Sequence, residues 1–183
     1  MNKNLRTIVC ATVVALLPWS AHAQETKAPV NPVIDAARLM LAQHAKNLIA
    51  SAESMPADKY AYHPTEPQMT FAQLIVHIVQ TNSFICSGIG ELPMPNVMNL
   101  GATESKDTLV AAIKQSFTHC SDALAKVDDG KLGDEVSMMG KRTGQTRARA
   151  LLVIVADWAD HYSTAASYLR MNGILPPSAQ AKK

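Results

Sequence analysis

Three side chains in this 183-residue chain have the chemistry of a metal site: His77, Asp157 and His161. Two imidazoles and one carboxylate suit Zn²⁺, Ni²⁺, Fe²⁺ or Mn²⁺ and leave coordination positions for water. Such an ion lowers the pKa of its bound water and creates a nucleophile or base near neutral pH. Asp157 and His161 are four residues apart, one turn along one face of a helix, whereas His77 lies about eighty residues away. Only a folded helical bundle can bring the three together.

A helical wheel favours an inward position for Asp157. At about 100° per residue, His161 lies about 40° from Asp157, in a sector shared with Tyr168, whereas Asp160 lies about 60° to the other, polar side. A carboxylate among apolar neighbours costs free energy unless it is paired or binds a metal. However, D-x-x-x-H is a common helical pattern. The alternative is therefore a hydrogen-bonded core histidine and a buried salt bridge from Asp157 to His161 or His77, with no metal.

Hydrophobic periodicity and capping signals predict the four helices that would position these residues. We expect helices over 33–53, from 70 to the glycines at 88 and 90, from 103 or 105 to about 127, and over 146–172. The signals that bound them are Pro32 and Pro56, the Thr70/Gln73 capping box and Gly88/Gly90, Ser105 or Thr103 and Gly130, and Thr146 and Gly173.

The last predicted helix is apolar around most of its circumference, which indicates that it is buried at the centre of the fold. Residues 131–145 contain three glycines and predict a polar, turn-rich connection, with a short hairpin around Gly140 as the alternative. These elements together predict an all-α fold, a four-helix bundle.

The first residues have the pattern of a secretory signal peptide. Lys3 and Arg6 precede an apolar run, and A-H-A at 21–23 fits the small-x-small rule for cleavage. The run is too short to span a bilayer comfortably, so a retained anchor is the less favoured alternative. We expect residues 1–23 to be removed, residues 24–183 to form a single domain, and the protein to be periplasmic or secreted in a bacterium.

Charge balance restricts the partners. Residues 1–23 hold two of the 17 Lys and Arg side chains and none of the 15 Asp and Glu, so the remaining 160 residues are formally neutral. A neutral domain without a basic stripe argues against nucleic acid and against an anionic membrane surface as partners. We expect a small-molecule substrate of unknown identity and no membrane contact after cleavage of the leader.

Two cysteines remain in the mature segment, Cys86 and Cys120. An even number in an exported protein predicts one disulfide, which would stabilise the fold by about 3–4 kcal/mol in the chain-entropy description. Two buried free thiols are the alternative.

Several motifs resemble the DinB/YfiT-like metalloenzyme family. They are P-A-D-K-Y at 56–60, P-T at 64–65, T-F-x-x-L-x-x-H at 70–77 and, most specifically, H-Y-x₅-Y-L-R-x-x-G-x-x-P-P at 161–177. The resemblance extends from about residue 33 to 177 and implies a four-helix bundle. It also implies a divalent metal held by one histidine of the second helix and an H-x-x-x-H pair of the last. His77 and His161 match these positions, and Asp157 stands where the pair's first histidine would be.

Two functions follow as hypotheses. The first is an exported DinB-like divalent-metal-binding protein that acts as a metal-dependent hydrolase or transferase; we do not expect thiol transfer, because an exported protein lacks an obvious supply of small thiols. The alternative is a non-catalytic, ligand-binding or homodimerising bundle with a degenerate metal site. We expect His63, next to Pro64, to line a pocket entrance. Tyr168 is either a donor to a metal-bound ligand or a packed aromatic residue.

Overall fold

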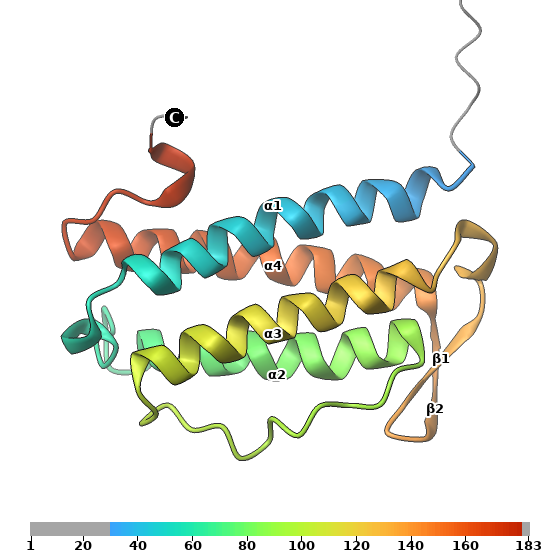
Figure 1. Cartoon of the computed structure of the whole chain (residues 1–183), viewed down its shortest axis with the longest axis horizontal. Helices are drawn as coiled ribbons and strands as arrows, with labels where there is room; N and C mark the ends of the chain where they lie inside the picture. The colour runs from blue at the N-terminus through green and yellow to red at the C-terminus, as the bar shows by residue number, and fades with distance from the viewer. Residues whose placement is uncertain (1–29, 181–183) are drawn as a thin grey trace, which may run out of the picture.

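Four long helices lie side by side in the computed structural model, which describes residues 30–180 (Figure 1). An antiparallel hairpin precedes the last helix, and short 3-10 helices lie at Ala57–Lys59, Asp129–Lys131 and Pro177–Ala179. The long elements are α1 Pro32–Ser54, α2 Phe71–Gly90, α3 Lys106–Ala125, β1 Glu135–Met138, β2 Lys141–Thr146 and α4 Arg147–Met171. The predicted helical bundle is confirmed, and the alternative of a hairpin around Gly140 is the correct description of that connection.

The helices form a ring in which α1 and α2 each pack against both α3 and α4. Helices α1 and α4 run in one direction and α2 and α3 in the other, and the 91–105 connection returns along the length of the bundle (Figure 1). Helices α2 and α4 are therefore antiparallel neighbours. This arrangement brings the middle of α2, with His77, beside the middle of α4.

The helix starts follow local hydrogen bonding. The Thr70/Gln73 capping box is present, and the Ser105 and Thr146 side chains accept from the backbone N–H of the third helical residue. Helix α1 has no such cap of its own. Instead the Asp129 carboxylate accepts from the first free N–H groups of α1, those of Val33 at 3.0 Å and Ile34 at 2.9 Å. A long-range contact thus performs the function that a local cap has elsewhere.

The predicted end of this helix at Gly88 and Gly90 is confirmed, since α2 ends at Gly90, but neither glycine adopts the left-handed conformation. The left-handed residue is the C-cap Glu91, with φ 53°. A Cβ at position 90 would lie 2.5 Å from Ala123 Cα, so glycine is needed there because α3 passes against the α2 backbone. Close helix approach, rather than a left-handed backbone conformation, explains why this position is glycine.

Replacing Gly90 by Ala is therefore expected to lower the free energy of unfolding by about 1–3 kcal/mol, because the added methyl group meets backbone that cannot rotate away. Urea denaturation measures the effect. The matched control is Gly101→Ala, whose new Cβ would have no neighbour closer than 3.6 Å. Equal stability of the two variants would contradict the packing role of Gly90.

Helix α4 is not the central, fully buried helix that its composition predicts. It packs on α1 and α2 and leaves Leu152 67% and Val153 42% exposed, while Ile154 and Trp158 are fully buried. Its apolar circumference therefore includes a solvent-facing part, so apolar content alone overestimates burial.

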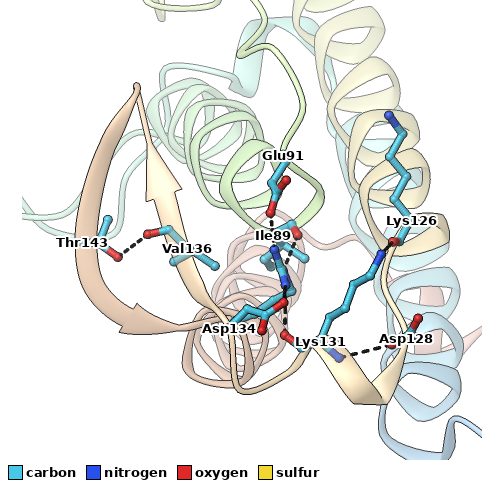
Figure 2. Close-up of polar contacts among 9 residues, drawn as sticks. Ile89, Glu91, Lys126, Asp128, Lys131, Asp134, Val136 and Thr143 are labelled. Carbon is cyan, nitrogen blue, oxygen red and sulfur yellow. Dashed lines mark hydrogen bonds and ion pairs between the residues drawn. The ribbon is translucent and has the colours of Figure 1, made fainter.

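A buried arginine joins the end of α2 to the start of α4. The Arg147 guanidinium, whose side chain is 3% exposed, donates to the backbone oxygens of Ile89 at 2.8 Å and Lys131 at 2.9 Å. It also donates to the carboxylates of Glu91 at 2.6 Å and Asp134 at 3.1 Å. Figure 2 shows these partners gathered at the base of the hairpin. The hairpin is thereby held at a fixed place against α2 and α4.

The predicted signal peptide, residues 1–23, lies outside the described residues. Within residues 30–180, none of the helices combines the length and the apolar character that crossing a bilayer requires.

Candidate metal centre

The three predicted ligands come together. His77 on α2 and Asp157 and His161 on α4 each offer a donor atom, and these atoms lie within 4.8 Å of one another. The His77 and His161 rings are stacked, with centroids 4.9 Å apart and planes inclined by 28°. Two helices that are far apart in sequence thus supply one group of donors. Among the described residues, this is the one group of three or more His, Cys, Asp and Glu side chains whose donor atoms lie this close together.

A buried amide fixes the register of α2 against α4 close to this group. Asn82 accepts from the indole N–H of Trp158 at 2.7 Å and donates to the Ser116 hydroxyl at 3.0 Å. Asn82 and Trp158 are completely buried, so both partners depend on this bond. Trp158 adjoins Asp157 in sequence, and the bond therefore helps to place the metal group. Sequence reasoning missed Asn82; it stands among Gln80, Thr81 and Ser83, so no local pattern marks it as buried.

The Cys86–Cys120 disulfide joins α2 to α3, with the two Cα atoms 5.0 Å apart and both residues buried. This is the pairing predicted from the sequence. The bridge lies on the face of α2 turned to α3, whereas His77 is turned to α4. Helix α2 is therefore fixed on both sides.

Hydrogen bonding orients the His161 ring. Its Nδ1 lies 2.6 Å from the backbone oxygen of Asp157, so Nδ1 carries the hydrogen and Nε2 presents a free lone pair. A second atom of that residue, Asp157 Oδ2, is 3.4 Å from His161 Nδ1 but is not hydrogen-bonded to it. The Nδ1 hydrogen is already used by the backbone. This pattern, with one ring nitrogen bonded to a backbone oxygen, is the usual arrangement of a metal-binding histidine.

The carboxylate of Asp157 is the unusual group of the site. Its side chain is 20% exposed, and Oδ2 is buried without a hydrogen-bond partner. Burial raises the pKa of Asp157, while the nearby His161 and His77 rings lower it to a smaller extent. An unpaired buried carboxylate oxygen is costly, and a cation among the three donors would remove that cost. The residues present therefore fit a divalent ion.

His63 and Tyr168, the two residues expected to line a pocket, contact the 60–70 segment rather than the metal group. His63 Nδ1 lies 2.9 Å from the Thr65 backbone oxygen in the 60–70 loop. Tyr168 is 3% exposed, donates its hydroxyl hydrogen to Met69 O at 2.8 Å, and packs edge-on against Tyr62. Its geometry is that of the packed aromatic residue, the alternative offered by the sequence. It ties the last turns of α4 to the segment that leads into α2.

Comparisons with known proteins identify the family and the fold. The model of the DinB superfamily matches residues 40–165, a range that includes all three proposed ligands. Crystal structures of two DinB-like proteins have the same fold. The one from Bacillus cereus is 15% identical with a TM-score of 0.63, covering 79% of this chain and 95% of that chain. The one from Bacillus subtilis is 21% identical with a TM-score of 0.62, covering 80% and 99%. No curated protein matches the chain. Because the family model covers more than half of its residues, the chain belongs to the DinB superfamily.

Proposed function

We propose that this protein is exported and holds one divalent metal ion on His77, Asp157 and His161, with which it catalyses hydrolysis or group transfer on a small molecule. The observation that carries the proposal is the convergence of three donor atoms within 4.8 Å, one of them from Asp157, whose Oδ2 is buried without a hydrogen-bond partner. When bound, a divalent ion supplies Lewis acidity and a hydroxide-like nucleophile near neutral pH.

The residues of the site have separate roles in this proposal. The backbone oxygen of Asp157 accepts from His161 Nδ1 and orients the ring, which leaves Nε2 as the nitrogen that would bind the ion. The Asp157 carboxylate would neutralise part of the ion's charge, and the stacked His77 ring would supply a ligand from α2. Three protein ligands leave at least one coordination position for substrate or water, as catalytic metal sites require.

Export is supported by two independent features. The leader-like pattern of residues 1–23 precedes the domain, and the domain contains a Cys86–Cys120 disulfide. Disulfides persist mainly in oxidising compartments such as the bacterial periplasm. These features support our proposal that the protein acts in the periplasm or outside the cell.

Metal content tests the proposal. Mature protein is loaded with Zn²⁺, Ni²⁺, Mn²⁺ or Fe²⁺ in turn, desalted, and assayed by elemental mass spectrometry. We expect about one ion per chain for at least one metal, and at least a tenfold lower content in His77→Ala, because one of three ligands is lost. His63→Ala is the matched control, since His63 lies outside the donor group and should keep the full content.

A non-catalytic bundle with a degenerate site is the second candidate. Asp157 stands where the family motif has a histidine, and its carboxylate lies 3.4 Å from His161 Nδ1, a spacing compatible with a simple ion pair when the ring is protonated. Absence of metal binding in the wild-type protein, with helix content intact, would favour this candidate.

A further inference from the structure

A pocket of about 570 Å³ begins at the metal group and extends along the α2/α4 seam toward the hairpin. Its lining residues come from α2, α4, the 91–105 connection and the hairpin. Its volume is typical of sites for small organic ligands. The apolar side chains that define it, called here the methionine pocket, are Phe84, Met94, Met98, Met138, Met139 and Val153.

Their high solvent exposure distinguishes these side chains from those of the core. Met98 is 66%, Met139 77% and Phe84 37% exposed, although each lines the same concave surface. Large apolar side chains gathered at one solvent-facing pocket indicate a binding surface. Methionine side chains are flexible and polarizable, so they can adapt to apolar ligands of different shapes.

The pocket is continuous with the metal group because His77 belongs to both. On α4, Arg149, Val153 and Asp157 follow one another at four-residue intervals, so they form one row along the helix. Arg149 and Asp157 are eight residues apart, about 12 Å along the axis. A ligand that extends from the metal group through the methionine pocket therefore reaches Arg149.

The charge of the residues that line the pocket indicates the charge of the group at one end of that ligand. Among the described residues that line the pocket, Arg149 is the one with a permanent charge, and no carboxylate accompanies it there. Its guanidinium is bonded to the neutral Gln145 side chain, which also lines the pocket. Arg149 is exposed at the rim, where its remaining donors can pair with an anionic group.

We infer that the methionine pocket binds an elongated organic monoanion. The apolar body of the ligand lies against the methionines, its anionic group pairs with Arg149, and its opposite end reaches the metal group at His77. This assignment of a substrate class rests on the proposed metal-dependent function for its catalytic meaning, while the binding itself depends on the pocket alone.

Two fluorescent probes that differ by one charge test the inference. They are 1-anilinonaphthalene-8-sulfonate and its neutral counterpart N-phenyl-1-naphthylamine, titrated into metal-free protein. Arg149→Gln is expected to weaken binding of the sulfonate by up to about fivefold, as for an exposed ion pair, and to change the affinity of the neutral probe less than twofold. Arg170→Gln, an exposed arginine in the last turn of the same helix, is the charge control.

Val153→Asp tests the location of the probes. A carboxylate in the apolar wall should weaken both probes at least tenfold. The control is Leu152→Asp at the neighbouring, 67% exposed position, which is not among the residues that line the pocket. Equal affinities for the two aspartate variants, or an Arg149→Gln effect that is the same for both probes, would overturn the inference. Circular dichroism melts verify that each variant is folded.

The two proposals fail in distinguishable ways. If the protein binds no metal but Arg149→Gln still weakens the sulfonate more than the neutral probe, the metal-dependent function is rejected and the pocket is retained. If the metal content is normal but Arg149→Gln affects both probes equally, the ligand class is rejected and the metal site is retained.

Discussion

Zinc at about a thousand times its Kd is expected to raise the free energy of unfolding of the wild-type protein by about 4 kcal/mol, and that of Asp157→Asn far less. The reason is linkage: the folded protein presents three convergent donors, whereas the unfolded chain separates His77 from the α4 pair. An amide in place of the carboxylate keeps the shape of the side chain but loses the charge that the ion requires. Urea denaturation with the disulfide intact, with and without zinc, measures both values.

In the absence of metal, Asp157→Asn is expected to raise the free energy of unfolding instead of lowering it. Burial raises the pKa of Asp157, so the folded state holds its proton more tightly than the unfolded state. The stability linked to this proton is present below the ordinary pKa of aspartate, near 4, and is lost as pH rises through the folded pKa. At pH 7 the chelator-treated Asp157→Asn variant should therefore be more stable than wild type. Asp160→Asn, on the exposed side of α4, is the comparison variant; the Asp160 charge is the smallest of the causes that raise the pKa of Asp157, so its removal should stabilise the protein less.

A reversal of sign between the metal-free and zinc-loaded states is the distinguishing result. A residue that only held the bundle together, through an ion pair with His161, would destabilise the protein in both states when replaced. That outcome would contradict the assignment of Asp157 as a ligand.

Removal of the disulfide is the second large effect. Cys86 and Cys120 are 34 residues apart, and closing a loop of this length restricts the unfolded chain by about 3–4 kcal/mol. The double variant Cys86→Ala/Cys120→Ala should lose slightly more than this amount, because both side chains are buried between α2 and α3 and alanine also leaves unfilled space.

Wild-type protein kept reduced throughout is the control for the disulfide prediction, since it removes the covalent link without removing side-chain atoms. It should lose slightly less stability than the double variant. Unchanged urea midpoints in the reduced protein and in the variant would show that the link contributes nothing to the fold.

Local sequence signals predicted the parts of this fold that depend on local hydrogen bonding. The caps at Thr70 and Thr146 and the glycine at 173, with φ 73°, lie where expected, because each satisfies backbone groups of its own helix. The convergence of His77 with the α4 pair was also predictable. The i, i+4 spacing and the wheel placed the pair on one face, and the family resemblance supplied α2 as its partner.

Features that depend on a distant partner were not predictable from one sequence. Gly90 is explained by the passage of Ala123 against it, and the α1 cap is supplied by Asp129, almost a hundred residues away. The buried Arg147 finds its acceptors on segments that are not its sequence neighbours. The methionine pocket is likewise assembled from two helices, a loop and a hairpin. Composition alone could not show that these methionines share one surface.

Anomalous diffraction at the zinc edge, from crystals of the zinc-loaded protein, tests the central claim most directly. We expect one strong peak between α2 and α4, about 2.0–2.2 Å from a His77 nitrogen, an Asp157 carboxylate oxygen and a His161 nitrogen. A peak at another place, or no peak within bonding distance of these three side chains in protein that is otherwise folded as described, would contradict it.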